Sequence, residues 1–66
     1  MTDEELLAAD ANPQWVHVRV KATDYEYEGW LVTAFGKRRP TQVRCVVEDD
    51  NGRLFIHNAS QLTAIP

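Results

Sequence analysis

The chain has 66 residues, a single cysteine and a formal net charge of −3. Because a domain needs at least about 50 residues, this length allows one domain and excludes a separate cofactor domain. One cysteine excludes an intramolecular disulfide framework, and no apolar run approaches the roughly 18 residues that span a bilayer. The cysteine and the two histidines are too scattered for a metal motif. We therefore expect a cytoplasmic protein with no membrane segment and no metal.

The negative charge is concentrated at the start of the chain. Four of the ten acidic residues lie within the first ten positions, which leaves six acidic against seven basic residues in the remainder. A general nucleic-acid binder uses a strong positive field, and a mimic of nucleic acid needs a strong negative one. The near-neutral remainder favours neither class.

Residues 1–13 predict an N-terminal arm that is either a short helix or disordered. Thr2 and Glu5 have the spacing of a capping box, and Asn12-Pro13 ends the pattern. A helix of about ten residues is marginal in isolation. We therefore expect an arm loosely attached to a domain of residues 14–66.

The remainder of the chain alternates apolar and polar residues with a period of two, which is typical of strands. We expect strands at residues 16–22, 29–35, 42–48, 53–57 and 62–65, separated by an acid-rich loop at 23–29, a basic turn at 36–41, a type I′ turn at 49–52 and a helical turn at 58–61. This order predicts an all-β fold, a small five-stranded SH3-like barrel with the short N-terminal arm. His17 and His57 lie in the polar phase and are expected at the surface, whereas Cys45 is expected to be buried.

Aromatic and basic side chains outside the expected core are candidates for binding a partner. The basic turn suits phosphates or an acidic protein, although the same charges also keep a hairpin tip solvated. The acid-rich loop with two tyrosines suits a basic or proline-rich ligand. Alternatively, one tyrosine packs under the loop and the other stays exposed. The predicted partner-binding residues are Tyr25, Tyr27, Trp30, Lys37, Arg38 and Arg39.

Residues 18–65 resemble the small SH3-like barrels found as short proteins in bacteria and their phages. The resemblance is carried by residues 27–29, 31–32, 61–62 and above all by the run at 46–58. It implies the fold and a compact protein of a phage or mobile element with a regulatory or anti-host role. It implies no particular activity.

The same layout is similar to the plasmid-borne type II dihydrofolate reductases, whose SH3-like protomers form a homotetramer around a central pore that holds folate substrate and NADPH. Their Val-Gln-Ile-Tyr motif corresponds to Leu54, Phe55, Ile56 and His57 here, and their pore lysine to Lys21. Phenylalanine lacks the amide hydrogen bonds of glutamine. The resemblance therefore favours the fold and self-assembly over reductase activity.

From the sequence we expect a non-enzymatic SH3-like module that binds another protein or copies of itself, with no catalytic residues and no cofactor. The first alternative is a small barrel that binds nucleic acid through the basic turn of Lys37, Arg38 and Arg39. The second is a homo-oligomeric, NADPH-dependent oxidoreductase of the type II reductase kind, with a pore site of Lys21, Leu54, Phe55, Ile56 and His57.

Overall fold

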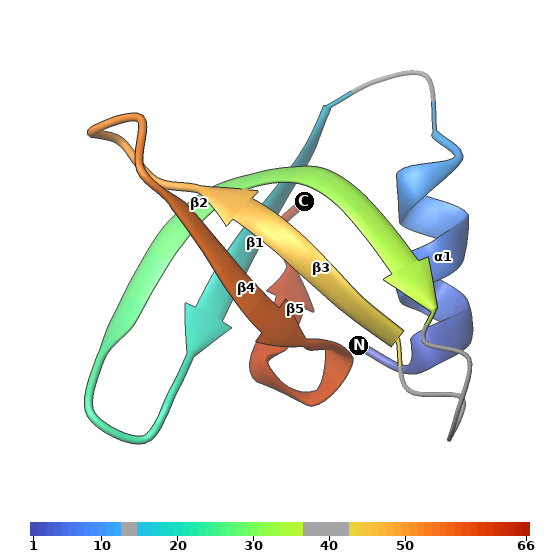
Figure 1. Ribbon diagram of the computed structural model, residues 1–66, viewed down its shortest axis with the longest axis horizontal. Coiled ribbons are helices and arrows are strands. Elements are labelled where there is room, and N and C mark those ends of the chain that lie inside the picture. Colours follow the sequence, from blue (N-terminus) through green and yellow to red (C-terminus); the bar gives the residue numbers. More distant parts are fainter. Residues whose placement is uncertain (13–14, 37–42) are drawn as a thin grey trace.

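The computed structural model describes residues 1–12, 15–36 and 43–66. Figure 1 shows one helix followed by strands that curve around a common interior. In chain order the elements are α1 (Asp3–Asp10), β1 (Val16–Lys21), β2 (Glu26–Gly36), β3 (Val43–Glu48), β4 (Leu54–Asn58), the 3₁₀ helix η1 (Ala59–Gln61) and β5 (Leu62–Ala64).

The N-terminal arm is a helix, and its start is the predicted capping box. The Thr2 hydroxyl oxygen accepts from the Glu5 backbone N–H at 3.1 Å, and a Glu5 carboxylate oxygen accepts from the Thr2 backbone N–H at 2.9 Å. Leu6 is fully buried in the core, and the Met1 ammonium group donates to the Leu62 carbonyl oxygen. The helix is therefore packed on the sheet and does not project as a loose arm.

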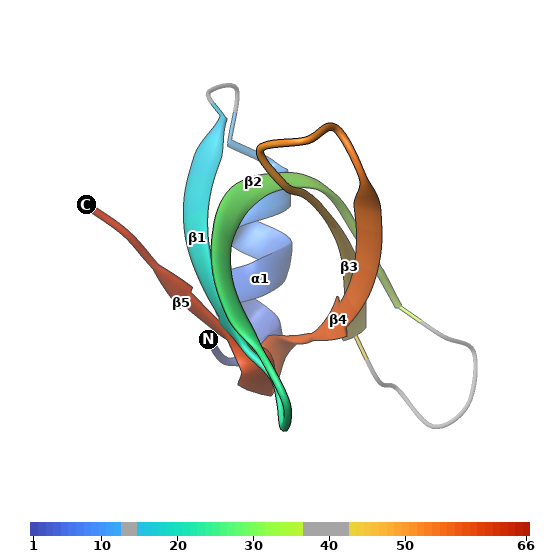
Figure 2. The same cartoon turned by 90° about the vertical axis from the view of Figure 1, so that its left-hand side faces the viewer.

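The strands form one antiparallel sheet in the order β4-β3-β2-β1-β5, so the predicted all-β class with five strands is confirmed. β4 and β5 are the two edges of this sheet. Among the described residues these two strands do not pair with each other, so the described sheet is not closed into a barrel. Figures 1 and 2 show that the curved sheet has two open ends, one of which is covered by α1. The β1–β2 and β3–β4 turns lie at the other end.

The predicted loop at residues 23–29 is wrong in extent, because β2 already begins at Glu26. A tight turn closes the β1–β2 hairpin, with the Ala22 backbone N–H donating to the Tyr25 carbonyl oxygen at 2.9 Å. Cross-strand pairing then continues along both strands, and the Arg19 guanidinium meets the Glu28 carboxylate at 2.9 Å. Charge pairing between the strands extends the hairpin into what looks, in sequence, like an acidic loop.

The turn at residues 49–52 is not the predicted type I′ turn. A type I′ turn needs positive φ at both central residues, whereas among the described residues only Gly52 has positive φ, at 80°. The Gly52 N–H donates to the Asp49 carbonyl oxygen at 3.1 Å, and Asp49 Oδ1 accepts from the backbone N–H groups of Asn51 and Arg53 at 2.9 Å each. The Asp49 carboxylate thus organises the turn by bonding its backbone.

The core lies between the helix and the inner face of the sheet. Its buried apolar members come from α1, η1 and four of the five strands, β4 being the exception, and are Leu6, Val18, Val20, Leu31, Ala34, Val43, Cys45, Val47, Ala59 and Leu62. Cys45 is buried as predicted, and its thiol donates to the His57 carbonyl oxygen at 3.6 Å. Burial raises the pKa of this thiol to about 11, so it stays protonated at neutral pH.

Gly29 allows β2 to pass close to β3. A Cβ at this position would lie 2.4 Å from the Glu48 carbonyl oxygen and 2.8 Å from a Val47 methyl carbon. Gly29→Ala therefore forces the two strands apart, and we expect it to lower the free energy of unfolding by about 1–3 kcal/mol. Urea denaturation followed by circular dichroism measures this.

The matched control is Gly36→Ala in the same strand, because a Cβ there meets no atom of the described residues within 4 Å. We expect this control to change the free energy of unfolding by no more than about 0.5 kcal/mol. Equal effects of the two substitutions would contradict the role of close strand contact at Gly29.

Leu6 joins the helix to the core, whereas its neighbour Leu7 is exposed. Truncating a fully buried leucine costs about 2–5 kcal/mol, and a domain of this size has only about 3–5 kcal/mol to lose. We expect Leu6→Ala to leave the chain largely unfolded at 25 °C and Leu7→Ala to be close to neutral. Thermal melts of both variants test this, and a cooperative melt of Leu6→Ala near the parent temperature would contradict it.

Candidate partner-binding site

A groove of roughly 310 Å³ is lined by residues of the β1–β2 and β3–β4 hairpins. The turns of these hairpins lie at the end of the sheet opposite the helix (Figure 1). The rings of Tyr25 and Tyr27 stack with centroids 5.9 Å apart, and the Phe55 ring lies 5.6 Å from Tyr27. Tyr25 is 50% exposed, whereas Tyr27 and Phe55 are half-buried. The groove lining consists of Tyr25, Glu26, Tyr27, Asp49, Arg53 and Phe55.

Charged groups surround the aromatic surface of this groove. The Arg53 guanidinium lies 6.0 Å from the centre of the Phe55 ring and 3.4 Å from the Asp49 carboxylate. The pKa of Asp49 is below its usual range, chiefly because the Arg53 backbone N–H donates to its carboxylate. Glu26 adds an exposed second carboxylate. At neutral pH the groove therefore combines two negative charges with one positive charge.

A buried polar network supports the aromatic surface. Gln61 Oε1 accepts from the Asn58 backbone N–H at 3.0 Å and lies 3.3 Å from His57 Nδ1. Because this oxygen only accepts, Nδ1 carries the proton, and the neutral ring then accepts at Nε2 from the Tyr27 hydroxyl at 2.7 Å. The network joins β2, β4 and η1 and holds Tyr27 in place.

The surface position predicted for His57 is wrong, since the residue is 3% exposed. The inner face of β4 carries Phe55 and His57, and Tyr27 provides the polar partner that allows a histidine to be buried. Burial lowers the pKa of His57 and raises that of Tyr27 to about 12. Neither group is therefore charged at neutral pH.

The predicted partner-binding residue Trp30 belongs to a different cluster. It lies on the outer face of β2, where His17 stacks on it at 4.7 Å and Trp15 meets it edge-on at 6.5 Å. His17 Nε2 also lies 3.8 Å from the Glu28 carboxylate. Thus the structure brings Tyr25 and Tyr27 together but separates them from Trp30, because side chains alternate between the faces of a strand.

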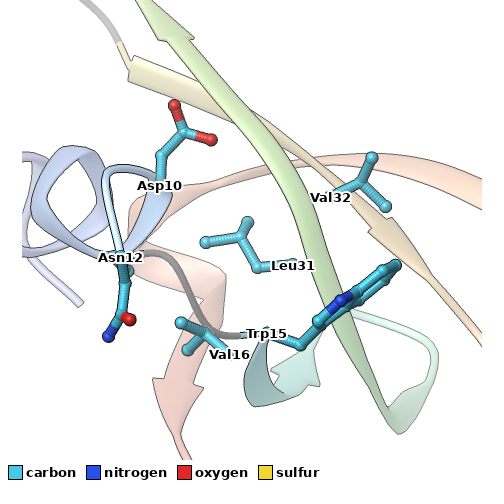
Figure 3. Close-up of a pocket in the computed structure, with 7 residues that line it drawn as sticks. Asp10, Asn12, Trp15, Val16, Leu31 and Val32 are labelled. Carbon is cyan, nitrogen blue, oxygen red and sulfur yellow. The ribbon is translucent and has the colours of Figure 1, made fainter.

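A second hollow, of roughly 160 Å³, lies where the end of α1 meets β2 (Figure 3). Figure 3 shows Leu31 between the helix end and Val32, with the Trp15 side chain directed along β2. Asp10 and Asn12 supply its polar lining. This hollow offers a smaller volume than the tyrosine groove.

The residues of the predicted pore site do not share one surface. Leu54 and Ile56 face outward from β4, Phe55 and His57 face inward, and Lys21 is exposed at the end of β1. Lys37, Arg38 and Arg39 lie outside the described residues, so their part in binding nucleic acid or protein stays a prediction. Asp49 and Arg53 were not among the predicted site residues, because only the hairpin turn brings them beside the tyrosines.

Comparison with known proteins found no matching family model, curated protein or solved structure. In the described ranges, no helix is long and apolar enough to cross a membrane, since α1 has only eight residues. The described residues also contain no group of three or more histidine, cysteine, aspartate or glutamate side chains placed to hold a metal ion.

The buried His57 makes stability depend on pH. Because its pKa is lowered from 6.5 in the folded state, the unfolded chain binds more protons when the pH falls below about 6.5. The contribution of neutral His57 is fully present above that pH and is lost as the pH falls toward the folded-state pKa. We expect the urea midpoint to decrease between about pH 7.5 and pH 5.5.

Two variants separate His57 from the other histidine in this experiment. His57→Gln should lower stability at pH 7.5 and remove most of the decrease between the two pH values. His17→Gln should retain the parent decrease. An unchanged pH dependence in His57→Gln would show that the buried network is not the origin of the effect.

Proposed function

We propose that this protein is a non-enzymatic binding module that recognises another protein through the tyrosine groove. The observation that carries the proposal is the exposed Tyr25 ring stacked on the half-buried Tyr27 ring beside Phe55, within a groove open to solvent. Aromatic side chains bind with large contact areas and little loss of side-chain entropy, since each has only two rotatable bonds. Aromatic-lined grooves are a recurring means of binding extended, proline-rich peptide segments.

The charges of the groove define the class of segment. Arg53 already lies beside Asp49, whereas Glu26 stands exposed near Tyr25. A lysine or arginine of the ligand gains from Glu26 and from the face of an exposed tyrosine ring. We therefore propose a basic or proline-containing peptide segment as the ligand.

The groove chemistry supports binding more than catalysis. His57, beneath the groove, and Tyr27, in its lining, are held neutral and bonded to each other. General acid–base catalysis requires a group with a pKa near the working pH that reaches a substrate. The pair instead fixes the shape of the groove.

The test is selection of binding peptides from a random displayed library by the purified protein. We expect enrichment of sequences that contain lysine or arginine together with proline. A selected peptide should bind at least tenfold more weakly to Tyr25→Ser, and Glu26→Gln should weaken peptides with a basic residue specifically. Isothermal titration calorimetry measures both effects.

Leu7→Ser serves as the control, because Leu7 is also an exposed apolar residue but lies on the helix at the other end of the sheet. It should leave peptide affinity unchanged. Failure to enrich any sequence family, or equal weakening by Leu7→Ser and Tyr25→Ser, would overturn the proposal.

A further inference from the structure

The edge strand β4 presents unpaired backbone groups. The Asp49 N–H donates to the Arg53 carbonyl oxygen at 3.0 Å, which makes Asp49 and Arg53 a hydrogen-bonded pair. Such pairs alternate along an antiparallel ladder. Phe55 and His57 therefore direct their N–H and C=O groups toward β3, whereas Leu54, Ile56 and Asn58 direct theirs toward the free edge.

Of these three residues, Asn58 already has a local partner, since its N–H donates to Gln61 Oε1 at 3.0 Å. Within the described ranges, the edge-facing N–H and C=O groups of Leu54 and Ile56 have no hydrogen-bond partner. The side chains of these same two residues are 60% and 61% exposed. The free backbone groups of this edge thus belong to two residues, and both of these residues have exposed apolar side chains.

Proteins usually protect such an edge with a charge, a proline, a bulge or a very short strand. β4 has the sequence Leu-Phe-Ile-His-Asn, which contains no aspartate, glutamate, lysine, arginine or proline. Its pairing with β3 shows no register shift, so it contains no bulge. The other edge, β5, pairs over only three residues and is followed by Pro66. The unprotected edge of β4 is therefore suited to pairing with another strand.

We infer that β4 pairs with β4 of a second copy of this chain, antiparallel about a twofold axis at Phe55. In this register Leu54 of the first copy forms a hydrogen-bonded pair with Ile56 of the second. By the twofold symmetry, Ile56 of the first copy forms the same pair with Leu54 of the second. The four backbone hydrogen bonds use all the free groups of both residues in both copies. The inference concerns the edge of β4 and does not depend on the proposed peptide ligand.

The side chains support the same register. Leu54 of one copy lies beside Ile56 of the other on the outer face, where Val46 of β3 is the next neighbour. Each exposed apolar side chain is then covered by its counterpart, with no charge on the two central strands. A register centred on Ile56 would instead pair Leu54 with Asn58, whose N–H is already bound to Gln61.

Analytical ultracentrifugation of the full chain from roughly 10 μM to 1 mM, the range in which small interfaces associate, tests the dimer. We expect a monomer–dimer equilibrium that Ile56→Lys weakens at least tenfold. Val32→Lys is the matched control, because Val32 is 45% exposed on the same face of the sheet but lies in the interior strand β2. A monomer at every concentration, or equal weakening by both variants, would overturn the inference.

The register has its own test. Cα atoms of a hydrogen-bonded antiparallel pair lie about 5.5 Å apart, within the range that a disulfide can bridge. A mixture of Leu54→Cys and Ile56→Cys chains should form a mixed disulfide on mild oxidation, several-fold faster than either variant alone. The native Cys45 is buried and does not compete. Faster crosslinking of Ile56→Cys alone would contradict an axis at Phe55.

Discussion

The burial of Leu6 is the contact on which the rest of this structure depends. A single curved sheet leaves its apolar interior open at both ends, and the described part of the chain has no second sheet to cover them. The capping box starts a short helix at the correct place, and Leu6 fills one end of the interior. The N-terminal helix is therefore part of the domain core.

The opposite end of the sheet is covered by side chains from the hairpins, and this difference between the ends creates the candidate site. Tyr27 and His57 satisfy each other's polar groups through one hydrogen bond, so His57 can be buried beneath the opening and Tyr27 can be half-buried at it. Phe55 and Tyr25 lie above them and remain accessible. Because the support is rigid and neutral, the groove offers a fixed aromatic surface for recognition.

The phase of β4 determines two properties of the surface at once. Once the β3–β4 ladder pairs Cys45 with His57, alternation directs Phe55 and His57 inward and exposes Leu54 and Ile56. The inward residues complete the groove, whereas the outward residues leave an apolar free edge. A shift of one residue in this register would exchange these roles.

The sequence by itself determined most of the elements: the capping box, the five strands in order, the helical turn before the last strand and the burial of Cys45 follow from local spacing and a period of two. The start of β2 at Glu26, and the choice between helix and disorder for residues 1–13, did not follow from it. The position of His57, the turn built by Asp49 and the separation of Trp30 from Tyr25 were decided by the tertiary structure. A buried histidine needs a partner from another strand, and only packing brings Tyr27 to it. Alternation predicts which residues share a face, but which face becomes the interior depends on how the strands pair and curve.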